Sequence, residues 1–198
     1  MKLDIRPLTG NAIKFEIRPL THPDLKLIRA PRFRDQRGYF AETYVRRDFA
    51  AAGIPIEFVQ DNESLSRARG TVRGLHFQIP PFAQAKLVRV LSGRIFDACV
   101  DLRRSSPRYG QHASVELSAE SGDQLFVPAG FAHGFCTLEP DTTVLYKVDA
   151  VYSAAHDRGI AWSDPTLAIR WPVGTDEAVL SAKDSALPPL RDLPIYFD

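Results

Sequence analysis

The sequence predicts a mainly β protein, built as an antiparallel sandwich or barrel, on three observations. Short runs rich in β-branched and aromatic residues recur about every 8–12 residues, with turn residues between them. Helical periodicity is confined to a few short stretches. The chain has 198 residues, of which 44% are hydrophobic, so it is long enough to bury the core of one domain.

The first 24 residues differ from the rest, and we predict an N-terminal extension over residues 1–24 followed by one domain over residues 25–198. The tetrapeptide Ile-Arg-Pro-Leu occurs twice in the extension, at residues 5–8 and 17–20. Two copies of four residues do not make a repeat architecture. Because proline cannot donate to a central ladder, we expect irregular or edge segments there.

From residue 25 onward the chain changes to short extended runs. We expect a strand over residues 38–44 and then a short helix over residues 46–52, which Gly53 closes as a left-handed C-cap. Further extended pieces are expected at residues 58–62, 113–117, 124–127, 133–138 and 142–148, and a last helical turn near residues 181–185.

Two apolar runs, residues 86–91 and 94–102, flank the dipeptide Ser92-Gly93. Both runs are rich in valine, isoleucine, leucine and phenylalanine. A two-residue turn that contains glycine between two such runs is typical of a β-hairpin. We therefore predict that these two strands pair with each other.

Charge and cysteine usage exclude several classes of partner. The chain has 25 Lys+Arg against 24 Asp+Glu, a formal net charge of +1, so neither nucleic acid nor a membrane surface is predicted to bind. Cys99 and Cys136 form neither a disulfide framework nor a CxxC site, which fits a reducing cytoplasm.

No apolar run approaches the ~20 residues that span a bilayer, and the first 20 residues lack the apolar centre of a signal peptide.

The most informative stretch runs from Gly122 to His133 and has the form G-x5-P-x-G-x2-H. It describes a turn, a strand and a proline-glycine corner that aims His133 into a barrel. The spacing resembles the second motif of the cupin superfamily, although a satisfied core histidine after a turn is an alternative. The resemblance implies a cupin-type jelly roll with short peripheral helices and an N-terminal arm.

The first cupin motif, which normally supplies histidines and a glutamate as metal ligands, is incomplete. Its place at residues 73–78 offers His76, with Gln78 where a second histidine would stand. The interval from Gln78 to Lys86 contains no carboxylate, and a lysine would repel a metal ion. Stable divalent sites normally have three or four protein ligands. We therefore predict no metal and no cofactor, and a metal-dependent cupin oxygenase becomes a weak alternative.

A histidine, a lysine, a tyrosine and arginines without a metal suit proton transfer next to a carbonyl group. A histidine can remove the α-proton as a general base, and a buried lysine can stabilise the enolate oxygen. A tyrosine can return a proton to the opposite face, which inverts the carbon without a redox cofactor. Arginines can hold a phosphorylated carrier.

Seven short segments occur in a fixed order along the chain: Asp35-Gln-Arg-Gly38, Phe58-Val-Gln-Asp-Asn62, Arg73-Gly-Leu-His-Phe-Gln78, Lys86-Leu-Val-Arg89, Phe131-Ala-His-Gly-Phe135, Tyr146-Lys147 and Ser181-Ala-Lys-Asp184. Together they resemble the dTDP-4-dehydrorhamnose 3,5-epimerase family of the dTDP-rhamnose pathway. The resemblance covers about residues 25–190 and implies a dTDP-sugar substrate. In this family an exchanged N-terminal strand brings part of the nucleotide site from the neighbouring subunit, so the resemblance also implies a homodimer.

The resemblance implies a role at each matching position. His76 is the general base, Asp184 orients it, Tyr146 is the proton donor on the other face, and Lys86 lies beside the carbonyl oxygen. Without the resemblance, Tyr146 reads as a packed strand residue and Asp184 as a helix cap. Implied substrate-binding residues are His133 for the sugar, Arg37, Arg73 and Lys183 for the diphosphate and nucleotide, and Glu42, Gln60, Asn62, Tyr152 and Asp157 for the remaining nucleotide contacts.

The predicted function is cofactor-free epimerisation of dTDP-4-dehydro-6-deoxy-D-glucose at carbons 3 and 5, which gives dTDP-4-dehydro-L-rhamnose. Both carbons flank the carbonyl at carbon 4, so both carry acidified protons. Two alternatives stay open: an epimerase that inverts carbon 3 alone, and a nucleotide-sugar binding cupin without catalysis. A tyrosine at position 146 favours double epimerisation, because carbon 5 must be reprotonated from the far face.

Overall fold

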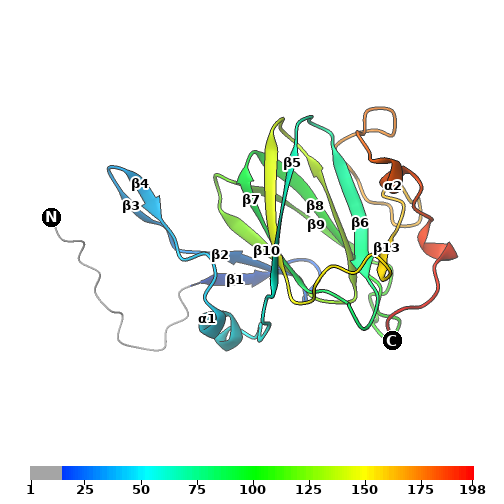
Figure 1. Cartoon of the computed structure of the whole chain (residues 1–198), viewed down its shortest axis with the longest axis horizontal. Helices are drawn as coiled ribbons and strands as arrows, with labels where there is room; N and C mark the ends of the chain where they lie inside the picture. The colour runs from blue at the N-terminus through cyan, green and yellow to red at the C-terminus, as the bar shows by residue number, and fades with distance from the viewer. Residues whose placement is uncertain (1–14) are drawn as a thin grey trace.

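The computed structural model describes residues 15–198, which form two antiparallel sheets packed face to face (Figure 1). Within these residues the larger sheet has six strands in the order β1 (Glu16–Pro19), β2 (Lys26–Arg29), β10 (Asp123–Val127), β7 (Lys86–Ser92), β12 (Thr142–Val148) and β5 (Gln60–Ser66). The second has five, in the order β13 (Asp157–Gly159), β6 (Val72–Gln78), β11 (Phe131–Thr137), β8 (Arg94–Asp101) and β9 (His112–Ser118). The predicted mainly β sandwich is confirmed.

The remaining elements are short and peripheral. β3 (Phe33–Asp35) and β4 (Gly38–Phe40) pair with each other as a hairpin that projects from the sandwich (Figure 1). The strand expected over residues 38–44 is therefore real but shorter. The expected helix is α1 (Arg46–Ala51), and Gly53 after it has a left-handed φ of +77°. Near the C-terminus lie α2 (Ala182–Ser185), the helical turn expected there, and a 3-10 turn, Leu190–Asp192.

The predicted hairpin between β7 and β8 is wrong. β7 pairs with β10 and β12 in the larger sheet, whereas β8 pairs with β9 and β11 in the other sheet. Gly93 between them has a φ of +78°, and a Cβ there would lie 2.3 Å from the hydroxyl of Thr142. Gly93, the single residue between the two strands, therefore carries the chain from one sheet to the other. Apolar runs on both sides fit either arrangement, since both strands face the same core.

The extension is partly described. Its first Ile-Arg-Pro-Leu copy lies outside the described residues. The second copy contributes to β1, which pairs with β2 alone at the edge of the larger sheet. The expectation of an edge segment is confirmed for this copy.

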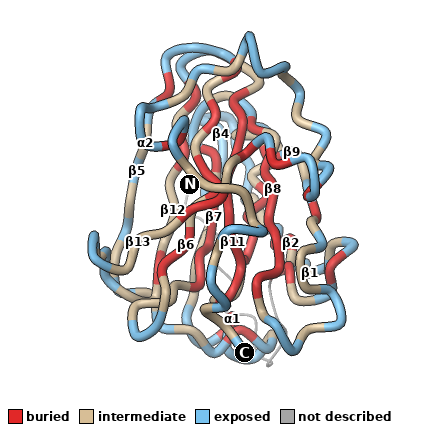
Figure 2. Tube along the Cα trace, turned by 90° about the vertical axis from the view of Figure 1, so that its right-hand side faces the viewer, coloured by how far each residue is buried: buried red, intermediate tan, exposed pale blue. Residues whose placement is uncertain are grey.

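The core lies between the sheets, where buried stretches of the strands face one another (Figure 2). It includes Val88 and Leu125 of the larger sheet and Ile95 and Leu117 of the other. α1 covers the outer face of the larger sheet through Phe49, and the C-terminal segment covers the outer face of the other. Within residues 15–198 no helix is long and apolar enough to cross a membrane. Three buried polar residues, Lys86, His133 and Asp184, line one cavity.

Candidate active site

A cavity of about 260 Å³ opens between the two sheets, with walls that come from both of them. Its lining residues are Ser64, Arg73, His76, Lys86, His133, Phe135, Tyr146, Ser181, Lys183 and Asp184. The predicted catalytic residues and three of the predicted substrate-binding residues therefore meet in one cavity. Ser64, Phe135 and Ser181 were not predicted, because a serine or a phenylalanine in a strand or turn has no distinctive sequence pattern.

His76 and Asp184 form the first of two histidine–aspartate pairs whose histidine lines the cavity. His76 lies on β6 and Asp184 in α2, and Nε2 of the histidine lies 2.5 Å from Oδ1 of the aspartate. Ser181 is the N-cap of α2: its Oγ accepts from the Asp184 N–H at 3.1 Å and donates to Asp184 Oδ2 at 2.9 Å. A short capped turn thus holds the carboxylate against a histidine 108 residues earlier in the chain.

The burial of this pair is uneven, which suits proton exchange with a ligand. The side chain of His76 is 30% exposed, whereas that of Asp184 is 5% exposed. Burial raises the pKa of Asp184, but hydrogen bonds from His76 and Ser181 and the charge of His76 outweigh burial, so the pKa is lowered overall. The carboxylate therefore stays ionised and can stabilise a protonated imidazole.

Lys86 begins β7 and reaches across the interior to the other sheet. Its Nζ donates to the carbonyl oxygen of His76 at 3.2 Å. Burial lowers the pKa of Lys86 to about 8, although the nearby Cys99, Asp97 and Asp157 act in the opposite direction. A buried ammonium group at the cavity wall favours an oxygen that develops negative charge beside it.

Tyr146 lies on the wall opposite His76. It belongs to β12 of the larger sheet, in register with Asn62 of β5 and Val88 of β7. Burial raises its pKa, with smaller opposing effects from Arg73 and Lys183. The phenol therefore keeps its proton near neutral pH and can act as a donor.

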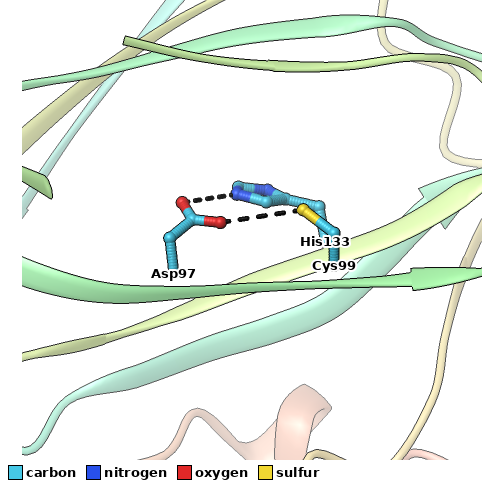
Figure 3. A group of neighbouring side chains, drawn as sticks. All are labelled: Asp97, Cys99 and His133. Carbon is cyan, nitrogen blue, oxygen red and sulfur yellow. Dashed lines mark hydrogen bonds and ion pairs between the residues drawn. The ribbon is translucent and has the colours of Figure 1, made fainter. Parts of the chain in front are cut away.

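The second histidine–aspartate pair lies deeper. His133 on β11 is in register with His76 on β6 and with Cys99 on β8. Its Nε2 lies 2.9 Å from Oδ2 of Asp97, a residue with no exposed side-chain surface. The thiol of Cys99 approaches the other oxygen of Asp97 at 3.8 Å (Figure 3). Sequence reasoning missed Asp97, although a carboxylate in the middle of an apolar strand is a visible signal.

Two glycines let the strands that carry these histidines approach each other. Gly74 of β6 has a φ of +123°, and a Cβ there would lie 2.6 Å from the Cα of Gly134 on β11. The register between β6 and β11 shifts at this point, next to His133. Side chains at either position would push the two strands apart and widen the cavity floor.

The mouth of the cavity is cationic. Lys183 forms an ion pair with Asp157, which also accepts a hydrogen bond from the Tyr152 hydroxyl at 3.1 Å. Arg73 donates to the hydroxyl of Ser66 at 3.1 Å. Lys183 and Arg73 line the cavity. Asp157 and Tyr152 are not among the lining residues, and they form a hydrogen bond with each other.

The other four predicted contact residues do not line the cavity. Gln60 and Asn62 lie on the edge strand β5, where the Gln60 amide donates to Asn62 at 2.8 Å and its oxygen accepts from the Tyr152 N–H at 3.1 Å. Arg37 lies in the projecting β3–β4 hairpin, paired with Asp35 at 2.6 Å, at the end of the molecule opposite α2 (Figure 1). Glu42 follows β4 and is half-buried. One chain therefore does not bring Arg37 to its own cavity.

Ser64 has an unusual environment. Among the side chains of residues 15–198, its hydroxyl is the one buried polar atom without a hydrogen-bond partner. Buried polar groups are usually paired. Because the hydroxyl faces the cavity, a polar ligand is well suited to pair with it.

The fold and the cavity together define a class of protein: a cupin-type jelly roll with a polar cavity between its two sheets. The sandwich supplies two facing walls, and the cavity places the imidazole of His76 and the phenol of Tyr146 on different walls. No group in this arrangement needs to change its oxidation state for a proton to move between the two faces.

Comparison with known proteins identifies the family. The family model described as dTDP-4-dehydrorhamnose 3,5-epimerase matches residues 19–192. A curated relative of that name from Sinorhizobium fredii is 55% identical over 178 residues, which are 90% of this chain and 91% of the relative. The chain belongs to the dTDP-4-dehydrorhamnose 3,5-epimerase family.

Solved structures agree. A dTDP-4-dehydrorhamnose 3,5-epimerase from Bacillus anthracis, with TDP and PPi bound, superposes with a TM-score of 0.86 at 49% identity, covering 89% of this chain and 99% of that one. A dTDP-6-deoxy-D-glucose-3,5-epimerase from Legionella pneumophila, in complex with dTDP-4-keto-L-rhamnose, gives a TM-score of 0.86 at 39% identity, covering 91% and 95%. The likeness to both spans nearly the whole chain.

Proposed function

We propose that this protein epimerises dTDP-4-dehydro-6-deoxy-D-glucose at carbons 3 and 5 to give dTDP-4-dehydro-L-rhamnose. The observation that carries the proposal is the placement of His76 and Tyr146 on opposite walls of one cavity, with Lys86 reaching between the sheets. A sugar ring held between these walls has a base on one face and an acid on the other.

In the first step, His76 removes the proton from carbon 3, and the electron pair moves onto the carbonyl oxygen at carbon 4. Asp184 acts as a positioning residue, because it fixes the imidazole and stabilises its protonated form. The ammonium of Lys86 stabilises the enolate oxygen, which is the largest charge that develops in the reaction. Tyr146 then delivers a proton to the other face of the carbon.

Once His76 has released its proton to solvent and Tyr146 has regained one, the same groups serve carbon 5, which flanks the carbonyl on its other side. The sugar ring must change its position in the cavity so that the proton on carbon 5 faces His76. The unpaired hydroxyl of Ser64 and the imidazole of His133 are polar groups of the cavity wall that can hold sugar hydroxyls in both presentations.

The nucleotide is proposed to lie outside the sugar cavity. A volume of about 260 Å³ is at the small end of ligand pockets, which commonly hold roughly 300–1,000 Å³. The diphosphate would meet Arg73 and Lys183 at the mouth, and the nucleoside would extend towards Gln60, Asn62 and Tyr152.

We infer a homodimer in which Arg37 and Glu42 of one subunit complete the nucleotide site of the other. The hairpin that carries Arg37 projects from its own sandwich and exposes apolar side chains, with Phe40 66% and Phe33 52% exposed. Such a hairpin suits a partner subunit better than water. The two free, buried cysteines support a cytoplasmic location, and the small net charge gives no reason to propose a nucleic-acid partner.

Proton NMR in deuterated water tests the proposed reaction. The protein is incubated with dTDP-4-dehydro-6-deoxy-glucose, and deuterium is followed at each carbon. Deuterium at carbons 3 and 5, with formation of the L-rhamno product, is the expected result. Exchange at carbon 3 alone would assign the protein to the single epimerases. No exchange, in folded protein that binds dTDP, would leave a binding protein or another sugar.

Subunit mixing tests the shared site. His76→Ala and Arg37→Ala each remove one half of the proposed site, and each homodimer should be weak. In a mixed dimer with exchanged arms, one of the two sites has both residues intact. Random mixing should therefore restore about a quarter of wild-type activity. If Arg37 serves its own chain, no mixed dimer contains an intact site, and activity should stay at the level of the parents.

A further inference from the structure

The side chains of Asp97, Cys99 and His133 form a cluster below the sugar cavity that the proposed reaction does not fully use (Figure 3). All three are buried, and their ligand atoms lie within 4.8 Å of one another. They come from neighbouring strands: Asp97 and Cys99 from the same face of β8, and His133 from β11 directly across from Cys99. The backbone of a paired ladder therefore holds the three groups in place.

The donor set is one that zinc prefers. Zinc takes thiolate, imidazole and carboxylate ligands, usually four of them in a tetrahedron. With bond lengths of about 2.0–2.3 Å, tetrahedral ligand atoms lie roughly 3.3–3.6 Å apart. Here the His133–Asp97 and Cys99–Asp97 distances are 2.9 and 3.8 Å. Shifts of about 1 Å or less would bring the three atoms around one ion.

The cluster is also reachable, and it leaves a coordination position open. His133 lines the cavity, so an ion can enter from there and displace the proton between His133 and Asp97. Three protein ligands with a fourth position towards a cavity is the arrangement of zinc sites that bind a further ligand. A phosphate-free sugar or water in the cavity can fill that position.

Charge balance favours the exchange. Asp97 shares a hydrogen bond with the imidazole of His133 and accepts one from the thiol of Cys99, which is a weak donor. On binding of Zn²⁺, the thiol of Cys99 releases its proton to solvent, and the ring nitrogen of His133 that faces the ion binds it through its lone pair, with any proton there passing to the other ring nitrogen or to solvent. The doubly charged ion then meets the carboxylate of Asp97 and the thiolate of Cys99, so the occupied cluster is neutral.

Lys86 is the cation that opposes binding. It lines the same cavity, and Asp97 and Cys99 lie close enough to influence its charge. An ion in the cluster removes the negative charge beside Lys86 and fixes the ring of His133. Both changes therefore affect cavity residues, Lys86 and His133, that would contact the sugar.

We propose that Asp97, Cys99 and His133 bind one zinc ion per chain and that this ion inhibits the enzyme from inside the cavity. The site shares His133 with the proposed sugar contacts, and it includes none of His76, Asp184 and Tyr146, which carry the proposed proton transfers. Zinc binding does not depend on the identity of the sugar, so it is measured without any nucleotide.

The test is a zinc titration of the metal-free protein against a chromophoric chelator, followed by X-ray absorption of the loaded protein. We expect one zinc per chain and a sulfur neighbour at about 2.3 Å. Cys99→Ala should weaken zinc binding by about 100-fold or more and make turnover insensitive to zinc, while basal turnover stays within about twofold of wild type.

Cys136 supplies the matched control, since it is the other free, buried cysteine and contacts the Thr137 carbonyl rather than a histidine. Cys136→Ala should bind zinc and be inhibited like the wild type. A zinc spectrum without sulfur, or a Cys99→Ala variant that binds zinc as the wild type does, would overturn the proposal. The spectrum of the wild type decides the question even if a variant folds poorly. Loss of zinc binding in both alanine variants would also contradict it, because only one of them removes a proposed ligand.

Discussion

The two histidine–aspartate pairs at the cavity use the same groups in different surroundings. His76 is 30% exposed, and its aspartate comes from a helical turn near the C-terminus. His133 is 7% exposed, its aspartate has no exposed surface, and both residues lie on adjacent strands of one sheet. The first pair can give and take a proton at the cavity surface, whereas the second is enclosed. Exposure of the imidazole, rather than the presence of an aspartate, separates the proposed general base His76 from the proposed binding group His133.

The largest effect is expected from His76→Asn, which removes the exposed imidazole and keeps a polar side chain. General bases contribute roughly 10²–10⁴-fold, and we expect kcat to fall about 10³-fold. Affinity for dTDP, measured by calorimetry, should change little, because the proposed nucleotide site lies outside the sugar cavity. Turnover within tenfold of wild type would remove His76 from its role.

Lys86→Met is expected to lower kcat by about 10²–10³-fold, as the loss of an oxyanion partner does. In the wild type, burial lowers the pKa of Lys86 to about 8, so the ammonium is lost as the pH rises through that value. We expect kcat to fall towards alkaline pH from about 8. The folded chain binds fewer protons than the unfolded chain between about pH 8 and 10.4, so the contribution of Lys86 to stability rises there. A pH profile of kcat beside one of thermal unfolding should show opposite slopes.

Asp184→Asn is expected to lower kcat by about 10²-fold, because the imidazole loses the charge that stabilises its protonated form. The lowered pKa of Asp184 means that its carboxylate stabilises the fold above its unfolded pKa of about 3.9 and loses this contribution as the pH falls through the lower folded value. The stability gap between wild type and variant, measured by urea unfolding, should therefore shrink in acid. A gap that grows in acid would contradict this reading of the pair.

Asp97→Asn makes the same substitution in the enclosed pair, and the effect on kcat should be within about tenfold at pH 7. The charge of Asp97 is one of the main influences that raise the pKa of Lys86, and Asp184 is not one of these main influences. The alkaline fall of kcat should therefore move to lower pH in Asp97→Asn and stay in place in Asp184→Asn. The two pH profiles, recorded side by side, distinguish the pairs. If the fall of kcat at alkaline pH moved in both variants, or in neither, the two histidine–aspartate pairs would not be distinct in this respect.

Sequence reasoning predicted the fold class and most strands, because alternating apolar residues and turn residues report local structure. It failed where one local sequence pattern is compatible with two different strand pairings. The segments around Ser92-Gly93 have the composition of a hairpin, yet each strand pairs in a different sheet. Which partner a buried strand takes depends on residues far along the chain.

Sequence reasoning likewise predicted some residues of the site and missed others. Resemblance to a family predicted that His76 and Asp184 act together, although they are 108 residues apart. Asp97 and Cys99 were missed, since strand register alone places them beneath His133. The nucleotide contacts of Arg37 and Glu42 stay a prediction, because they depend on a second chain.

The central claim is that His76 and Tyr146 act on opposite faces of the sugar, and Tyr146→Phe in deuterated water tests it most directly. The phenylalanine keeps the ring but cannot donate a proton. His76 should still remove each proton and return deuterium to the same face, so NMR should show exchange with little inversion at carbon 5. Inversion at the wild-type rate would contradict the account, and so would the loss of exchange at both carbons in a variant that folds and binds dTDP.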